Sequence, residues 1–163
     1  MTMYNLKDKV AIVTGAGGKN GIGRAVADRL AQEGAKIIVT DIVEVPYSDG
    51  DWEGLSSVVE EITSRGGEAA KLLVDVTDAS SIENAIDKAL NIFNRVDILV
   101  NNAGAAASKD RVSIVDLEEE DWDRVIDINL KGVFLFSKLF AKELIAQKEG
   151  GKIINIASIA GKK

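Results

Sequence analysis

Short apolar runs alternate along the chain with longer stretches in which apolar residues recur at helical spacing. The short runs predict buried strands, and the longer stretches predict helices. Strands are expected at 10–14, 36–41, 69–76, 96–101 and 152–157, and helices behind residue 23 and at 53–65, 78–94 and about 118–147. This alternation with short connections predicts an α/β fold, a doubly wound parallel sheet with helices on both faces and strand order 3-2-1-4-5.

A glycine-dense turn, residues 15–23, follows the first apolar run, and a helical stretch follows the turn. A strand, a glycine turn and a helix in this order place unpaired backbone N–H groups and the positive end of a helix dipole against an anion. The sequence therefore predicts a phosphate-binding turn here.

The second apolar run ends in a carboxylate, Asp41, which lies 18 residues after Gly23. A carboxylate about 20 residues beyond such a turn can accept hydrogen bonds from both ribose hydroxyls of an adenosine, and it repels a 2′-phosphate. It therefore favours NAD over NADP as the cofactor. The other interpretation of Asp41 is a helix cap or turn residue.

The other expected strands also end in polar or small residues. Asp75 and Val76 end the third strand, residues 101–104 end the fourth, and Ser158 follows the fifth. In an open parallel sheet a ligand binds beyond the carboxyl ends of the strands, where the strand order reverses. We therefore expect the binding site at this rim, between the first and fourth strands.

Two motifs resemble the short-chain dehydrogenase/reductase family over essentially the whole chain, as its N-terminal two thirds. The family pattern Thr-Gly-x-x-x-Gly-x-Gly is matched at its fixed positions, with five residues instead of three between the first two glycines, by Thr14, Gly15, Gly21, Ile22 and Gly23. The family signature Asn-Asn-Ala-Gly is found at Asn101, Asn102, Ala103 and Gly104. The resemblance implies a Rossmann-type fold that lacks the C-terminal part of the family fold, and it implies that these positions bind the cofactor.

The resemblance also implies roles for the individual residues. The Asp75 carboxylate would contact the adenine amino group and the Val76 N–H a ring nitrogen, although Asp75 could instead cap the next helix. Small residues at 103 and 104 would let a flat ring and its ribose lie close to the backbone. Asn101 is expected to be purely structural.

Two catalytic residues are expected, Asn129 and Ser158. Asn129 and Gly132 interrupt a long apolar helix in which both are poor helix formers, so a hydrogen-bonded, buried amide and a local break in the backbone ladder are predicted. The resemblance implies that Asn129 holds a water of a proton relay and that Ser158 hydrogen-bonds the substrate oxygen. The alternatives are a kink-stabilising asparagine and a turn-capping serine.

The family's catalytic Tyr, with a Lys four residues later, is expected beyond residue 163. Tyr4 precedes the first strand and Tyr47 lies on the adenosine side, so neither can replace it. The chain therefore resembles a fragment, and by itself it is expected to show no turnover.

The favoured function is an NAD-dependent oxidoreductase that interconverts a secondary alcohol and a ketone. The first alternative is a dinucleotide-binding module without turnover. The second is an S-adenosylmethionine-dependent methyltransferase, against which residues 101–104, Asn129 and Ser158 speak.

Composition and charge restrict the partners. The net charge of −6 disfavours nucleic acid and anionic membranes, and the absence of His and Cys disfavours a metal site and excludes a His-dependent hydrolase triad. With no apolar run near 18 residues and no signal-peptide core, we expect a single cytoplasmic domain, 1–163, that acts on a small-molecule alcohol or carbonyl. The helix 122–145 is apolar on more than one face, which predicts a homo-oligomer.

Overall fold

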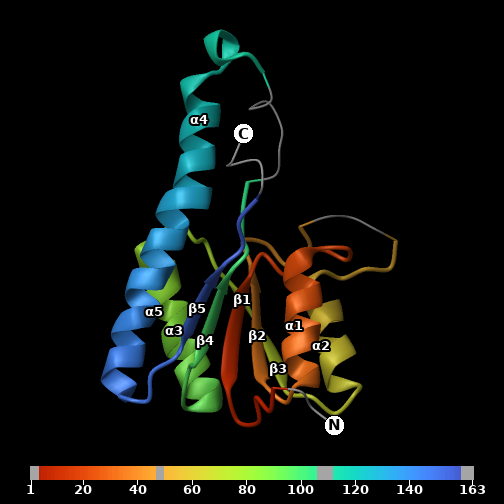
Figure 1. Ribbon diagram of the computed structural model, residues 1–163. Helices are drawn as coiled ribbons and strands as arrows, with labels where there is room; N and C mark the ends of the chain where they lie inside the picture. Colours follow the sequence, from red (N-terminus) through yellow and green to blue (C-terminus); the bar gives the residue numbers. More distant parts are fainter. Residues whose placement is uncertain (1–3, 47–49, 106–111, 159–163) are drawn as a thin grey trace.

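A five-stranded parallel sheet forms the centre of the protein (Figure 1). The computed structural model describes residues 4–46, 50–105 and 112–158. The strands are β1 (Val10–Thr14), β2 (Lys36–Asp41), β3 (Ala69–Leu73), β4 (Ile98–Asn101) and β5 (Lys152–Asn155). Their order is β3-β2-β1-β4-β5, and every pair is parallel, so the predicted sheet is confirmed.

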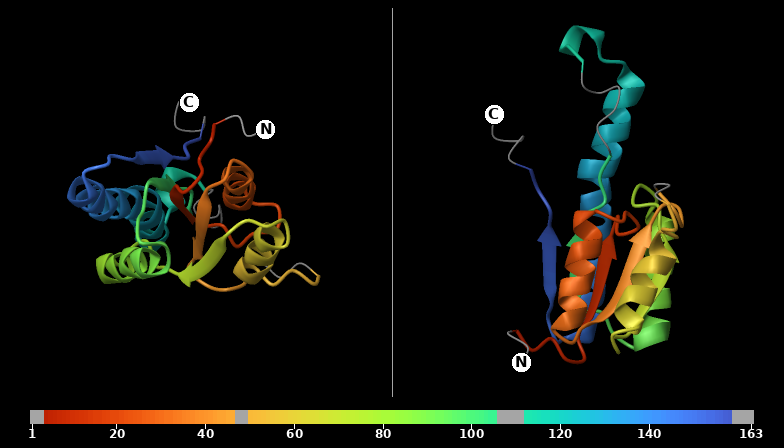
Figure 2. Two further views of the ribbon diagram at one scale, coloured as in Figure 1. Left: turned by 90° about the horizontal axis from the view of Figure 1, so that it is seen from below. Right: turned by 90° about the vertical axis from the view of Figure 1, so that its right-hand side faces the viewer.

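Helices cover both faces of the sheet (Figures 1 and 2). One layer consists of α1 (Ile22–Gln32) and α2 (Leu55–Thr63), and the other of α3 (Ala79–Phe93) and α5 (Val133–Gln147). A short 3-10 helix (Ile114–Asp116), α4 (Glu119–Ile126) and a π-helical turn (Asp127–Gly132) precede α5. The rod formed by α4, this turn and α5 extends well beyond the carboxyl edge of the sheet (Figure 2).

The alternation of side chains along β1 explains its continuous apolar run. Val10 and Ile12 belong to the core beneath α3 and α5, whereas Ala11 and Val13 belong to the core beneath α1 and α2. Because successive side chains of a strand point to opposite faces, a strand covered on both faces must be apolar at every position. All five residues of β1 are buried.

The predicted boundaries are wrong at the end of the third strand, which stops at Leu73 instead of residue 76. The backbone pairing ends with the hydrogen bond from Val74 N–H to the Asp41 carbonyl. Beyond it the Asp75 carboxylate accepts hydrogen bonds from the N–H and the hydroxyl of Thr77, which closes a turn. Asp78, and not Asp75, caps α3 through Ser80 N–H.

None of the helices in the described part of the chain is long and apolar enough to cross a membrane.

Candidate functional site

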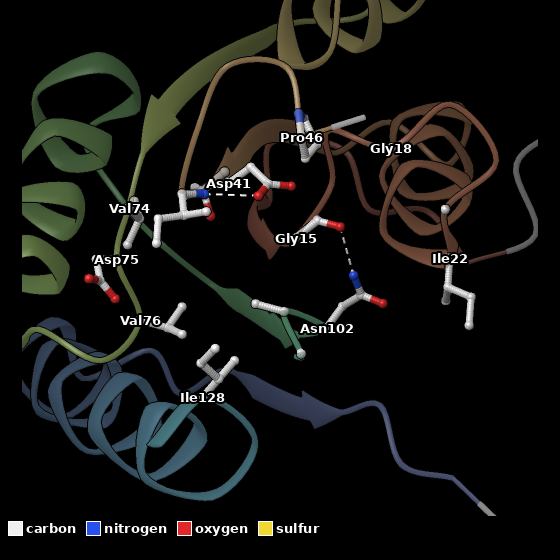
Figure 3. A pocket seen from close by; sticks show the side chains of 15 residues that line it. Gly15, Gly18, Ile22, Asp41, Pro46, Val74, Asp75, Val76, Asn102 and Ile128 are labelled. Atoms are coloured by element: carbon white, nitrogen blue, oxygen red, sulfur yellow. Dashed lines mark hydrogen bonds between the residues drawn. The ribbon is translucent and has the colours of Figure 1, made fainter. Parts of the chain in front are cut away.

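A cavity of about 290 Å³ opens at the carboxyl edge of the sheet, where the strand order reverses between β1 and β4 (Figure 3). It is lined by Gly15, Gly18, Gly21, Ile22, Thr40, Asp41, Ile42, Pro46, Val74, Asp75, Val76, Asn102, Ala103, Gly104 and Ile128. The structure therefore brings most of the predicted binding residues to one cavity. Among the predicted cofactor residues only Thr14 and Gly23 are absent from this lining, and both are next to residues that line it.

Side-chain hydrogen bonds tie the end of β1 to the end of β4 behind the cavity. The Thr14 hydroxyl donates to the Val100 carbonyl (3.3 Å) and accepts from the N–H groups of Asn102 (3.0 Å) and Ala103 (2.9 Å). The Asn102 side-chain amide donates to the carbonyls of Thr14 and Gly15, each at 2.9 Å. Thr14 and the Asn102 amide therefore hold the two strand ends in register, and their side-chain donors are already used within the protein.

Gly15 and Gly23 stand where the backbone leaves no room for a side chain. Gly15 has φ +63°, and a Cβ added to it would lie 2.8 Å from the Ala103 Cα. A Cβ on Gly23 would lie 2.6 Å from both the Asn102 Nδ2 and the Gly15 carbonyl oxygen. These distances explain the two glycines as packing requirements of the tied strand ends.

The longer glycine loop, residues 16–20, turns its carbonyl groups toward the protein. Those of Gly17, Gly18 and Lys19 accept hydrogen bonds from Trp52, Gly21 and Arg24. In contrast, the N–H groups of Gly18, Asn20, Ile22 and Gly23 have no acceptor among the described residues. A loop that uses its carbonyls and leaves its N–H groups at a helix N-terminus suits an anion.

Asp41 lies beside this loop at the end of β2. Its Oδ2 accepts from Gly17 N–H at 3.0 Å and its Oδ1 from Ile42 N–H at 2.9 Å. Burial raises the pKa of the carboxyl, and the two N–H donors only partly offset this effect. Asp41 therefore braces the glycine loop in addition to lining the cavity.

Val74, Asp75 and Val76 form the opposite wall together with Ile128 from the π-helical turn (Figure 3). Gly132 of the same turn makes this approach possible, because a Cβ there would lie 2.9 Å from Val76 Cγ2. Asp75 and Val76 thus reach the predicted place, but from the loop after β3 and not from the strand itself.

The helix break predicted at Asn129 is confirmed by the π-helical turn, Asp127–Gly132. The Asn129 side chain was expected to be buried, but it is exposed, because α4 and the π-helical turn project past the sheet edge. The Asn129 Oδ1 nevertheless accepts a hydrogen bond from Ala105 N–H at 2.8 Å. Ser158 is exposed, lies three residues beyond β5, and does not line the cavity.

Asn101 has the structural role predicted for it. Its buried side chain donates hydrogen bonds to the Ser137 hydroxyl (3.0 Å) and the Asn155 Oδ1 (2.8 Å), which joins β4 to α5 and β5. Tyr4 lies at the opposite edge, where its N–H donates to Glu33, as expected. Tyr47 falls outside the described residues.

The sequence interpretation missed Trp52, Pro46 and Ile128. The only signal for the first two was the unusual length of the loop after Asp41, because α/β connections are mostly 2–6 residues long. In the described part of the chain, no group of three or more His, Cys, Asp or Glu residues could hold a metal ion.

Comparison with known proteins identifies relatives over nearly the whole chain. The model of a family described as short chain dehydrogenase matches residues 9–163. Over 159 residues the chain is 38% identical to 2-dehydro-3-deoxy-D-gluconate 5-dehydrogenase of Escherichia coli K12, covering 98% of this chain and 57% of that protein. Over 159 residues it is 41% identical to a 3-oxoacyl-(acyl-carrier-protein) reductase of Synechocystis, covering 98% of this chain and 59% of the relative.

A solved structure gives the same result. The short-chain type dehydrogenase/reductase of Mycobacterium marinum superposes with a TM-score of 0.87 at 31% identity, covering 98% of this chain and 60% of that one. The chain thus spans about three fifths of the length of these relatives.

Proposed function

The chain belongs to the short-chain dehydrogenase family, and we propose that it forms the dinucleotide-binding part of an NAD-dependent oxidoreductase that interconverts a secondary alcohol and a ketone. The observation that carries the proposal is the cavity at the strand-order reversal. At this cavity lie loop N–H groups that have no acceptor among the described residues, the Asp41 carboxylate, and glycine positions that leave no room for a side chain.

The residues of the cavity fit the successive parts of a dinucleotide. The N–H groups of Gly18, Asn20, Ile22 and Gly23, which have no acceptor among the described residues, would bind the pyrophosphate. Asp41 would accept hydrogen bonds from the adenosine ribose. Asp75 and Val76, on the opposite wall, would contact the adenine. The small residues 103 and 104 leave room for the nicotinamide half.

The bound dinucleotide would accept or donate the hydride, and residues of this chain would handle the oxygen and the proton. We assign Ser158 to hydrogen-bonding the substrate oxygen. We assign Asn129 to holding a water, because the hydrogen bond from Ala105 N–H fixes its side chain and the π-helical turn interrupts the backbone ladder around it.

NAD is expected to bind at least about tenfold more tightly than NADP, because Asp41 accepts from the 2′-hydroxyl and repels a 2′-phosphate. Calorimetric titration of both cofactors measures this ratio. In Asp41→Ala the preference should shrink, whereas Asp87→Ala, an exposed control on α3, should retain it. Equal or tighter NADP binding by the unmodified chain would contradict the proposal for the cofactor.

A homo-oligomer is expected through the projecting rod of α4, the π-helical turn and α5. Its exposed apolar side chains include Trp122 (51% exposed), Leu130 (64%), Phe134 (57%) and Ile145 (76%). An exposed apolar surface of this kind favours association between copies. Light scattering after size-exclusion chromatography should give a mass above 17.4 kDa, and Phe134→Ser with Ile145→Ser should lower it. A concentration-independent monomer of the unmodified chain would refute this prediction.

A further inference from the structure

Trp52 reaches the glycine loop from the connection between β2 and α2. Its indole Nε1–H donates a hydrogen bond of 2.7 Å to the Gly17 carbonyl oxygen. The ring is partly buried and packs against the core beneath α1 and α2. The indole is therefore a donor held against the core, and its hydrogen bond restrains the path of the loop.

Arg24 holds the same loop two residues further along. Its Nη1 donates to the Lys19 carbonyl oxygen at 2.9 Å, and its guanidinium lies 5.2 Å from the centre of the Trp52 ring. The rest of the guanidinium forms a two-point contact with Glu61 of α2, at 2.8 and 2.6 Å. The carbonyls of Gly17 and Lys19 are thus both restrained by side chains that pack on α2.

This restraint also determines where the adjacent N–H groups point. In a trans peptide the C=O of one residue and the N–H of the next lie in one plane and point in opposite directions. Fixing the Gly17 and Lys19 carbonyls against Trp52 and Arg24 therefore turns the Gly18 and Asn20 N–H groups away from that side. Neither N–H has an acceptor among the described residues, and Gly18 lines the cavity.

We propose that Trp52 is a positioning residue that aims the N–H groups of the lengthened glycine loop at the pyrophosphate of the dinucleotide, with Arg24 and Glu61 as its support. This inference rests on the proposed dinucleotide function. Five residues separate Gly15 from Gly21, and such a loop needs a contact from outside it to hold one conformation. Trp52 supplies the brace without contacting the ligand itself.

The test compares a ligand that carries the pyrophosphate with one that lacks it. Trp52→Phe keeps an aromatic ring in the core and removes the N–H donor. It should weaken ADP-ribose binding about tenfold and adenosine binding less than twofold, as measured by calorimetry. Trp122→Phe on α4 is the matched control and should leave both affinities unchanged.

Glu61→Gln provides a second route if Trp52→Phe fails to fold. It leaves the indole in place and weakens the contact that orients Arg24, so it should also reduce affinity for ADP-ribose more than affinity for adenosine. In the Trp122→Phe background Trp52 is the single tryptophan, because the chain has two. Its indole N–H is hydrogen-bonded to the carbonyl of the peptide that also carries the Gly18 N–H, so its fluorescence emission should shift when ADP-ribose binds to that N–H and stay constant with adenosine.

An equal loss of affinity for ADP-ribose and adenosine would assign Trp52 a merely structural role and overturn the inference. Unchanged ADP-ribose affinity in both variants would overturn it as well. These results leave the proposed function standing, provided that the unmodified chain binds ADP-ribose. Failure of the unmodified chain to bind either ADP-ribose or NAD would overturn the proposed function and this inference together.

Discussion

Gly23→Ala is expected to lower the free energy of unfolding by about 1–3 kcal/mol and to abolish measurable binding of NAD, because the added methyl overpacks a closed junction. The new Cβ would lie 2.6 Å from the Gly15 carbonyl oxygen and 2.6 Å from the Asn102 side-chain amide. The carbonyl belongs to the backbone and cannot swing aside. Relief of the clash must therefore separate α1 from the tied ends of β1 and β4, which moves the loop N–H groups.

Chemical denaturation and calorimetry with NAD measure the two effects separately. The matched control is Ala25→Ser, which adds one heavy atom to an exposed position of the same helix and should change stability by no more than about 0.5 kcal/mol. If Gly23→Ala bound NAD as tightly as the unmodified chain, the junction would not determine the shape of the cavity.

The sheet and the first half of the site follow from local sequence patterns. β1 is apolar from residue 10 to residue 13 and β2 from residue 37 to residue 39, because helices cover both faces of the sheet, so both strands could be predicted within a residue. The glycine turn and Asp41 could also be predicted from local sequence, because their roles depend on their spacing along the chain. Strand order then placed them at one rim, and the structure confirms that placement.

The rest of the site depends on contacts between distant residues. Trp52 donates a hydrogen bond to the carbonyl of Gly17, which lies 35 positions earlier in the chain. No local sequence pattern predicts this contact. β3 ends at Leu73 because Asp75 forms a turn with Thr77. The sequence does not indicate this turn, since apolar residues continue to residue 76. The exposure of Asn129 likewise follows from the projection of α4 past the sheet, which is a tertiary property.

A second large loss of stability is expected when Asp97, at the opposite edge of the sheet, is replaced. This carboxylate is 4% exposed and accepts hydrogen bonds from Val10 N–H (2.9 Å), Lys9 Nζ (3.0 Å) and the Arg95 guanidinium (2.8 and 2.6 Å). Arg95 also pairs with Glu149, at 2.7 Å. The network joins the beginnings of β1 and β4 to the connection that follows α5.

The contribution of Asp97 to the free energy of unfolding depends on pH, because its side chain is charged. Burial acts to raise the pKa of the carboxyl, but the hydrogen bonds from Arg95, Val10 and Lys9 outweigh it and hold the pKa below its ordinary value. A carboxyl whose pKa is lower in the folded state stabilises the protein at pH values above its unfolded pKa, about 4. This stabilisation is lost as the pH falls through the lower folded pKa.

Asp97→Asn should therefore lower the free energy of unfolding at pH 7 by about 3–5 kcal/mol, because it leaves two cations facing an uncharged, donor-bearing amide. The deficit relative to the unmodified chain should begin to shrink below about pH 4, where the carboxyl of the unfolded chain takes up a proton, and it should disappear once the pH falls below the lower pKa of the folded state. Urea denaturation across this pH range measures both, with exposed Asp87→Asn as the control. A deficit that stayed constant down to pH 2 would show that packing, and not the charge, is what Asp97 contributes. Since the network lies at the edge opposite the cavity, folded Asp97→Asn should bind NAD with unchanged affinity, which separates stability from binding.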